Sequence, residues 1–258
     1  MSEIDLIKYY NKFCEDKRLN SRHGQVEFRI TMKYIKKFLH EFNSPKIIDV
    51  GAGTGKYAIE LNNMGYDVTA IELVKYNLGI LKSKCNGVKA FQGDARNLKK
   101  FKDEQFDIVL LFGPMYHLLS YDDKLMAMQE AKRITKKGGI IFISYLMNDY
   151  AILVHGFRDG NIVNEIKNNK IGEGFQILSA EPDLYSYSRI DEIDKLKNDC
   201  GLTRIGIVAQ DGPTDYMRQV VNSFTEDEFE LYIKYIESIA ERKEMLGASS
   251  HVLDILKV

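Results

Sequence analysis

Five apolar runs alternate with helical patterns between residues 46 and 147, and no other feature of the sequence constrains the fold as strongly. The runs are KIIDV, YDVTAIEL, VKAFQGDA, FDIVLLFG and GIIFISYLM. Nearly continuous apolar strands that alternate with helices are typical of a parallel sheet covered by helices on both faces. The crossovers between such strands are expected to be right-handed. The sequence therefore predicts an α/β fold whose core spans residues 45–147.

Residues 1–44 predict a helical cap in front of this core. Apolar residues recur every four positions from Val26 to Phe38, which predicts a helix from about Gly24 to Asn43. The helix is expected to end before the Ser-Pro pair that follows, because the residue before a proline is pushed out of the helical region. A shorter helix is expected earlier in the segment.

Two insertions follow the core, and the α/β rhythm resumes between them. We expect residues 148–188 to be partly helical and residues 189–210 to add one helix and one strand. The second insertion, residues 213–246, contains the capping-box sequence TEDE, which predicts one amphipathic helix over residues 225–246. The final HVLDILKV predicts a strand that returns beside the preceding one. We therefore expect a single domain over residues 1–258, in which the insertions form a substrate lid.

The composition excludes several classes of protein. The 258 residues carry 36 Lys and Arg against 37 Asp and Glu, a net charge of −1, which argues against a basic surface for coating nucleic acid. No apolar stretch reaches the roughly 18 residues of a membrane span. Three separated cysteines without a CxxC pair, and a start without a signal-peptide pattern, predict a cytoplasmic protein with reduced thiols. No pattern of ligand residues predicts a metal site.

The first strand leads directly into a glycine-rich loop, DVGAGTG at residues 49–55. Glycines at alternating positions let the chain turn sharply and let a ligand approach the backbone before a helix begins. A phosphate-binding P-loop requires G-x-x-x-x-G-K-[ST], but Val50 stands five positions before Gly55, and Tyr57 follows Lys56. A dinucleotide fingerprint requires G-x-G-x-x-G, and here the third glycine comes one residue early. The pattern that matches is D-x-G-x-G-x-G.

Four further features follow the loop in order. Glu72 ends the second strand, 17 residues after the last loop glycine, where an acid faces the ligand crevice of an α/β sheet. The sequence GDAR at 93–96 follows the third strand, FDIVLLFGP at 106–114 is a buried strand, and KGGI at 137–140 turns into the fifth. Each feature has an ordinary explanation by itself, as a tight turn or a solvated charge. Their order and spacing together are what carry a functional interpretation.

This set of motifs resembles class I S-adenosylmethionine (SAM) methyltransferases. The resemblance covers residues 45–147 well, and residues 189–210 and 250–258 by pattern only. It implies a Rossmann-like seven-stranded sheet of order 3-2-1-4-5-7-6 with an antiparallel last strand and helical cap segments. It also implies that SAM is the cofactor and that S-adenosylhomocysteine (SAH) is the product.

The resemblance assigns cofactor contacts to the matching positions. The loop residues would lie under the methionine moiety, Glu72 would hold the ribose with Leu73 beside the adenine, and the residues after the third strand would contact the adenine edge. Those after the fourth strand would lie near the sulfonium, and Tyr57 would add a further contact. The expected cofactor-binding residues are Asp49, Gly51, Ala52, Gly53, Gly55, Tyr57, Glu72, Leu73, Asp94, Ala95, Phe112 and Gly113.

The segment GPMYH at 113–117 supplies the candidate catalytic residues. His117 is a candidate base because its ordinary pKa lies near neutrality, and Tyr116 could orient the acceptor or lie against the sulfonium. Packing roles explain both residues equally well. The segment departs from the [DNS]-P-P-[YFW] box of amino-methylating family members at Gly113 and Met115, which puts methylation of nucleobases or glutamine amides of that type in doubt.

The sequence thus predicts a SAM-dependent methyltransferase that acts on a small-molecule acceptor by in-line displacement. We expect no membrane association, no nucleic-acid partner, and a monomer or homodimer. Two alternatives stay open: an RNA or protein methyltransferase, and a non-catalytic SAM-binding regulator on the same fold.

Overall fold

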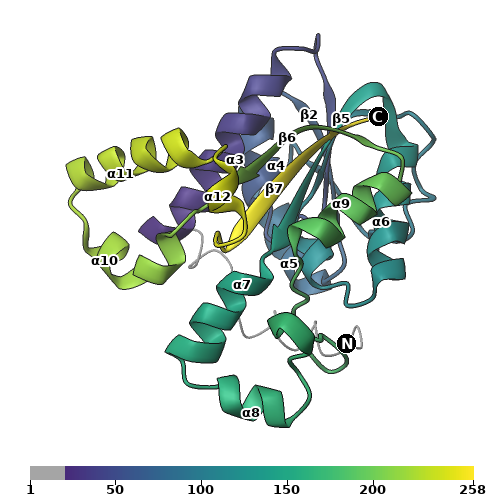
Figure 1. Cartoon of the computed structure of the whole chain (residues 1–258). Helices are drawn as coiled ribbons and strands as arrows, with labels where there is room; N and C mark the ends of the chain where they lie inside the picture. The colour runs from purple at the N-terminus through teal and green to yellow at the C-terminus, as the bar shows by residue number, and fades with distance from the viewer. Residues whose placement is uncertain (1–20) are drawn as a thin grey trace.

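The computed structural model describes residues 21–258, and a seven-stranded sheet runs through its centre (Figure 1). The strand order is β3-β2-β1-β4-β5-β7-β6, and β7 is antiparallel to both of its neighbours. The other neighbouring strands pair in parallel. The strands are β1 (Lys46–Val50), β2 (Asp67–Glu72), β3 (Lys89–Gln92), β4 (Phe106–Leu111), β5 (Thr135–Leu146), β6 (Thr203–Ala209) and β7 (His251–Lys257). The predicted fold class, strand order and antiparallel last strand are confirmed.

Helices surround the sheet and connect its strands. The α-helices are α3 (Arg22–Leu39), α4 (Lys56–Asn63), α5 (Lys75–Lys84), α6 (Tyr121–Ile134), α7 (Asn148–Ala151), α8 (Ile162–Lys167), α9 (Ile190–Asp199), α10 (Arg218–Ser223), α11 (Glu226–Ile239) and α12 (Lys243–Leu246). The elements η1 (Gly113–Tyr116), η3 (Glu173–Phe175) and η4 (Thr214–Met217) are short 3₁₀ helices, and η2 (Ile152–Arg158) is a π-helix. None of the helices between residues 21 and 258 is long and apolar enough to cross a bilayer.

The core consists of two apolar layers, one on each face of the sheet. Ile47 and Ile140 pack with α3, α4, α5 and α11, whereas their neighbours Ile48 and Ile141 pack with α6 and α9. Successive side chains of a strand point to opposite faces, so a strand covered on both faces must be apolar throughout. This is why the strands read as continuous apolar runs rather than as alternating patterns.

Two predicted boundaries are wrong by a few residues. Helix α3 ends at Leu39 rather than near Asn43, and Ser44 adopts a left-handed backbone (φ 53°) that no α-helix accommodates. Strand β5 begins at Thr135, so the predicted turn over 137–140 lies within the strand, where Gly138 takes φ 76°. The short helix predicted near the N-terminus, with the segment 1–20, lies outside the described residues.

The amphipathic helix predicted over residues 225–246 is divided into α11 and α12. Arg242 has an extended backbone between them, and the carbonyl of Ala240 accepts a hydrogen bond from Ala209 N–H at 2.8 Å. Because that carbonyl bonds to β6, it is not available to continue the helix. The hydrogen bond at this break therefore attaches the second insertion to strand β6 of the sheet.

The start of α11 carries the capping box that the sequence predicted. Thr225 accepts a hydrogen bond from the N–H of Glu228, and the Glu228 carboxylate accepts from Thr225 N–H at 2.7 Å. We expect Thr225→Ala to lower the free energy of unfolding by about 1 kcal/mol, the usual value of an N-cap. Urea denaturation measures this loss. Ser238→Ala, at an exposed serine of the same helix, is the matched control and should change stability by less than half as much. Equal effects of the two substitutions would contradict a capping role.

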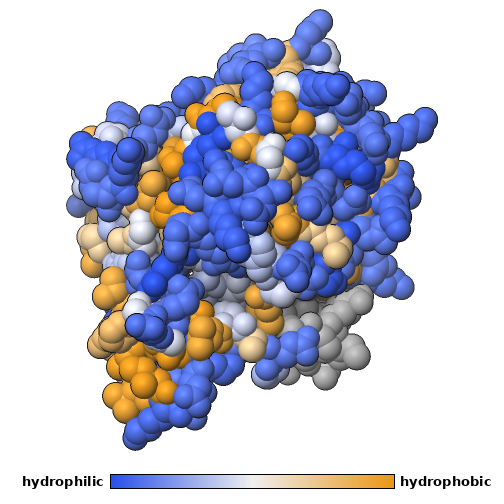
Figure 2. Space-filling model, turned by 45° about the vertical axis from the view of Figure 1, so that its right-hand side comes forward, coloured by the Kyte–Doolittle hydropathy of each residue, from blue (hydrophilic) through white to orange (hydrophobic). Residues whose placement is uncertain are grey.

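The two insertions occupy different sides of the molecule. Residues 213–246 pack on α3, where Arg29 pairs with Glu230 and Lys33 pairs with Glu237 at 3.1 Å. Residues 148–188 form a separate lobe beside the carboxyl ends of the strands (Figure 1). Apolar side chains gather on this lobe (Figure 2). The exposed ones are Leu153, Phe157, Val163, Ile166, Phe175 and Leu178.

Candidate cofactor and active site

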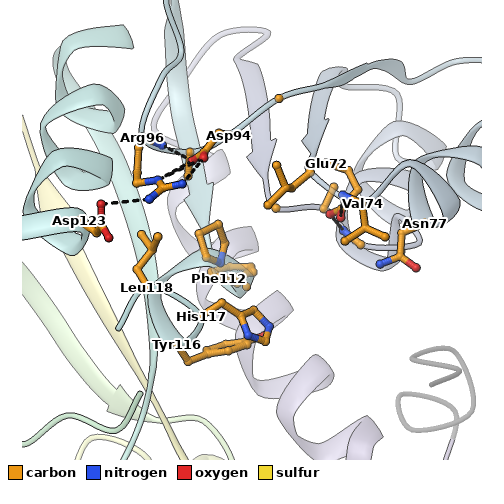
Figure 3. Close-up of a pocket in the computed structure, with 18 of the residues that line it drawn as sticks. Glu72, Val74, Asn77, Asp94, Arg96, Phe112, Tyr116, His117, Leu118 and Asp123 are labelled. Atoms are coloured by element: carbon orange, nitrogen blue, oxygen red, sulfur yellow. Dashed lines mark hydrogen bonds and ion pairs between the residues drawn. The ribbon is translucent and has the colours of Figure 1, made fainter. Parts of the chain in front are cut away.

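A cavity of about 490 Å³ opens at the carboxyl edge of the parallel strands (Figure 3). This is where ligands bind in open α/β sheets, and the volume falls in the range of small-molecule sites. Every predicted site residue lines it except Gly55. The residues are Asp49, Gly51, Ala52, Gly53, Tyr57, Glu72, Leu73, Asp94, Ala95, Phe112, Gly113, Tyr116 and His117. The structure therefore brings together residues from four separate parts of the chain.

The glycine loop passes directly beneath the segment that follows β4. A Cβ atom on Gly51 would lie 2.3 Å from Cδ of Pro114, and Gly51 has φ 77°, so only glycine fits there. Gly53 (φ 56°) faces open space inside the cavity. Gly55 (φ 91°) faces away from the cavity, because its Cβ would lie 2.7 Å from Cγ of Leu81. Gly55 therefore allows the backbone turn at the start of α4 and is not part of the cavity wall.

Glu72 connects the loop to the first turn of α5. Its carboxylate accepts hydrogen bonds from Gly53 N–H at 2.7 Å and from Val74 N–H at 2.8 Å. Figure 3 shows Glu72, Val74 and Asn77 together on one side of the cavity. Burial raises the pKa of Glu72, and the hydrogen bonds from the loop, α5 and Asn77 oppose that rise. The carboxylate therefore fixes the shape of the loop and also faces the cavity.

Asp49 is the most unusual acid of the cavity. The residue is 2% exposed, and its Oδ2 atom has no hydrogen-bond partner in the described part of the structure. Burial, and then the negative charge of Glu72, raise the pKa of Asp49 to about 7, against a smaller opposing hydrogen bond from Ala58 N–H. An unpartnered buried carboxyl oxygen is costly, so a ligand that donates a hydrogen bond there stabilises the protein.

Asp94 is engaged by a neighbouring arginine. Its Oδ2 atom lies 2.6 Å from Arg96 Nη2, and the guanidinium also reaches Asp123 Oδ1 at 3.1 Å (Figure 3). Burial alone would raise the pKa of Asp94, but the hydrogen bonds and charge of Arg96 outweigh it and lower the pKa. The predicted adenine contact is therefore held in place by a residue whose role the sequence analysis did not recognise.

Tyr116 at the end of η1 and His117, which follows it, form an aromatic group with Tyr185 of the first insertion. The ring centroids of His117 and Tyr185 are 5.2 Å apart in a stacked arrangement, and those of Tyr116 and His117 are 5.0 Å apart. The Nδ1 atom of His117 lies 3.0 Å from the carbonyl oxygen of Leu184. A carbonyl only accepts, so Nδ1 carries the hydrogen and Nε2 carries the lone pair. Burial lowers the pKa of His117 to about 4, so the imidazole is neutral near pH 7.

Several lining residues gave no signal in the sequence. Glu27 lies on α3 among apolar neighbours, and residues 179–181 come from an irregular part of the first insertion. Neither belongs to a motif, and only the folded chain brings them to the sheet edge. No residue of 213–246 lines the cavity. Between residues 21 and 258 no group of three or more His, Cys, Asp or Glu side chains could hold a metal ion.

The cavity fits the cofactor that the motifs imply. The orphaned Asp49 oxygen can accept a hydrogen bond from an ammonium group, and Gly53 borders open space, because nothing lies within 4 Å of the position of its Cβ. Glu72 offers carboxylate oxygens at the end of β2, where ribose hydroxyls bind in this class of fold.

Comparison with known proteins identifies the core of the chain. Residues 48–143 match the family model described as "Methyltransferase domain". A demethylmenaquinone methyltransferase of Staphylococcus haemolyticus is 32% identical over 131 residues, which cover 48% of this chain and 53% of that protein. A glycine/sarcosine N-methyltransferase of Aphanothece halophytica is 27% identical over 132 residues, 49% of each chain. The chain thus spans about half the length of these curated relatives.

Solved structures share the fold over most of the chain. A SAM-dependent methyltransferase from Archaeoglobus fulgidus has a TM-score of 0.59 at 15% identity, with 95% of this chain and 97% of that chain covered. A possible histamine N-methyltransferase from Thermotoga maritima has a TM-score of 0.54 at 20% identity, with 90% and 98% covered. Residues 48–143 thus match a methyltransferase domain, and the sheet order agrees with the class I SAM-dependent methyltransferase fold that the motifs imply.

Proposed function

We propose that this chain binds SAM in the cavity at the sheet edge and transfers its methyl group to a small-molecule acceptor, with SAH as the product. The observation that carries the proposal is the buried, unpartnered carboxyl oxygen of Asp49 near Gly53, which borders open space in the cavity. Asp49 lines the cavity beside Gly51 and Gly53, where the methionine moiety would lie.

The assigned contacts follow the order of the strands. Gly51, Ala52 and Gly53 would lie under the methionine moiety, and Glu72 would hold the ribose hydroxyls. Leu73, Asp94 and Ala95 would surround the adenine, while Phe112, Gly113 and Tyr57 would lie near the sulfonium. Tyr57 and Phe112 support this assignment because their rings pack edge to face at 4.9 Å, on the side of the loop that faces β4.

When bound, SAM supplies an activated methyl group on a sulfonium. This chain's residues have to align the acceptor, exclude water and take up a proton where the acceptor carries one. Tyr116 and His117 lie at the end of β4, next to the expected position of the sulfonium, which supports a role in placing the acceptor. His117 would act through Nε2, as a neutral hydrogen-bond acceptor and a weak base.

The size and charge of the cavity support a small acceptor. Its volume of about 490 Å³ must hold both SAM and the acceptor. Carboxyl groups predominate in its lining, which disfavours a polyanion such as RNA. The names of the two relatives point to acceptors as different as a demethylmenaquinone and glycine. They therefore support a small-molecule acceptor in general and do not indicate one compound. A cytoplasmic location and a monomeric or dimeric state stay predictions.

Calorimetric titration with SAM and SAH tests the proposal, and Glu72→Ala is the informative variant. We expect wild-type protein to bind both ligands and the variant to bind them 10- to 100-fold more weakly, because hydrogen bonds to a charged group contribute about 1.5–3 kcal/mol. Asp67→Ala, at the exposed opposite end of the same strand, is the matched control and should leave affinity unchanged.

Two results would count against the proposed function. Absence of SAM binding by the folded wild-type protein would overturn the cofactor assignment. Binding of SAM without formation of SAH in any extract fraction would favour a non-catalytic regulator over an enzyme.

A further inference from the structure

We propose that a second cavity, within the first insertion, binds an uncharged apolar arm of the acceptor. The acceptor is then an amphipathic molecule: its reacting group lies in the cavity at the sheet edge, and its arm extends into the insertion. This inference rests on the proposed function and names the substrate class of the same site. It is carried by the size and lining of the second cavity, by the contacts that shape it, and by the wall that the two cavities share.

The second cavity has a volume of about 240 Å³ and lies among η2, α8 and residues 170–187. Apolar side chains form much of the wall that the structure describes: Ala151, Ile152, Ile171, Ile177, Leu184 and Tyr187. An apolar cavity of about 150 Å³ is large enough for benzene, so this one accommodates a substituted ring or a short alkyl chain. The ligand class that fits is therefore an uncharged hydrocarbon group.

A buried asparagine holds one wall of the second cavity in place. Asn148, the first residue of α7, is fully buried, and its side-chain oxygen accepts a hydrogen bond from Ile177 N–H at 2.8 Å. Its side-chain amide donates to the carbonyl of Phe175 at 3.0 Å. Ile177 in turn forms an antiparallel bridge with Ile171. Both isoleucines are thus fixed relative to the end of β5, so the cavity has a defined wall on this side.

Another wall comes from η2. This element is a π-helix, and the wider turns of π-helices occur frequently at functional sites. Ile152 and Gly156 line the cavity from successive turns of the helix. A Cβ atom on Gly156 would lie 3.0 Å from Cδ1 of Ile162, so the absence of a side chain lets α8 lie close to η2. Specific packing therefore sets this wall as well.

Several polar groups of the lining are paired with one another. Lys170 Nζ lies 2.6 Å from Asp183 Oδ1, and Asp183 Oδ2 accepts a hydrogen bond from Ala180 N–H at 2.9 Å. The side-chain amide of Asn161 donates to the carbonyl of His155 at 3.1 Å. A charged ligand group would have to compete with these pairs, whereas a hydrocarbon group needs no polar partner. The pairs therefore favour an uncharged arm.

The two cavities share a wall. Ser179 lines both of them. Leu184 and Tyr185 line the second cavity and contact His117, which lines the first. The Leu184 carbonyl oxygen lies 3.0 Å from Nδ1 of His117, and the Tyr185 ring stacks on the imidazole at 5.2 Å. A single stacked pair of rings thus separates the cavities here, and they adjoin at Ser179.

This arrangement divides the acceptor between reaction and recognition. Its reacting group lies beside Tyr116 and His117, which are neighbours at the edge of the first cavity (Figure 3). Its arm passes Ser179 and supplies binding energy from a part of the molecule that does not react. Each methylene group that becomes buried raises the affinity about fourfold.

Calorimetry on the full chain saturated with SAH tests this inference, with 1-butanol and 1-hexanol as probes. Hexanol has two more methylenes, so the wild-type protein should bind it at least fivefold more tightly. Ile171→Trp narrows the second cavity and should reduce this preference below twofold. It should leave the affinity for SAH unchanged, because Ile171 does not line the first cavity. Leu153→Trp, at an exposed position of η2 that lines neither cavity, is the matched control and should keep the wild-type preference.

Turnover connects the second cavity to the acceptor. With an extract fraction that yields SAH, Ile171→Trp should form SAH at least tenfold more slowly than the wild-type protein. Leu153→Trp should react at the wild-type rate. An unchanged rate in a folded Ile171→Trp protein would overturn the proposed arm of the acceptor.

The outcomes separate this inference from the function on which it rests. Absence of SAH binding by the wild-type protein would overturn the methyltransferase proposal itself. Intact SAH binding with equal affinity for the two alcohols would overturn only the apolar arm. Equal losses of preference in the two tryptophan variants would overturn it too, because the alcohols would then bind to the exposed face of the insertion.

A fluorescent reporter decides the matter if Ile171→Trp does not fold. The chain has no tryptophan of its own, so Tyr187→Trp places a single indole in the lining of the second cavity. Hexanol should shift its emission to shorter wavelengths because the alkyl chain displaces water there. Tyr235→Trp, at an exposed position of α11, is the control and should show no shift. Unchanged emission from Tyr187→Trp would contradict the second cavity as the binding site.

Discussion

Gly51→Ala is expected to weaken SAM binding at least 100-fold. The new Cβ would lie 2.3 Å from Cδ and 2.6 Å from Cγ of Pro114, and a proline ring fixed to the backbone cannot move aside as a flexible side chain can. The loop and the segment after β4 would have to separate, which would displace both walls of the cavity. Calorimetry with SAM measures the loss, and circular dichroism shows whether the sheet persists.

Gly65→Ala is the control that distinguishes the effect of this clash on SAM binding from the effect of a strained backbone. Gly65 has φ 92°, but a Cβ there meets nothing within 4 Å, and the residue lies away from the cavity. It should lose only the roughly 1–2 kcal/mol of stability that a left-handed alanine costs and should bind SAM normally. If both variants bind SAM equally well, the close approach of the loop to Pro114 does not determine the cofactor site.

The sequence predicts the parts of the site that depend on local backbone rules. The glycine loop, the acid at the end of β2 and the turn after β3 each follow a strand, and parallel strands must end at one edge of the sheet. That is why Asp49, Glu72 and Asp94 could be placed in one cavity before the fold was known. The exception is Gly55, whose spacing fits the motif but whose missing side chain makes room for Leu81.

The other lining residues could not be predicted in the same way. Glu27 and His251 are separated by most of the chain and meet only because α3 packs beside the start of β7. Residues 179–181 reach the cavity through an irregular segment that follows no periodicity. The break between α11 and α12 depends on a hydrogen bond from β6 to Ala240, which no helical pattern encodes. Long-range contacts decide each of these features.

The motif residues and the other lining residues of the cavity therefore differ in how the sequence specifies them. Cofactor binding would use backbone geometry that a short motif can specify, whereas the other lining residues come from α3 and from the first insertion. Charge illustrates the difference: the chain is almost neutral at −1, yet the cavity lining is strongly acidic. Net charge therefore argued against a general nucleic-acid surface but carried no information about the acceptor site.

Asp49→Asn is expected to stabilise the ligand-free protein at pH 8 and to weaken SAM binding at least tenfold. Burial, followed by the charge of Glu72, raises the pKa of Asp49 from 3.8 to about 7. The folded protein therefore keeps a proton that the unfolded chain releases between about pH 4 and pH 7, so stability falls as the pH rises through that window. At about 1.36 kcal/mol per pKa unit, ionised Asp49 costs the fold up to about 4 kcal/mol at pH 8.

The neutral amide removes that cost, so thermal unfolding of the ligand-free variant should occur at a higher temperature than wild type at pH 8 and at a similar temperature at pH 4. Asp67→Asn, at an exposed position of the neighbouring strand, should not show this crossover. In the proposed function the same carboxylate accepts a hydrogen bond from the cofactor's ammonium, so we expect the variant to gain stability and to lose affinity for SAM. A variant that gains stability but binds SAM with wild-type affinity would remove Asp49 from the cofactor site, because its buried charge would then serve no ligand.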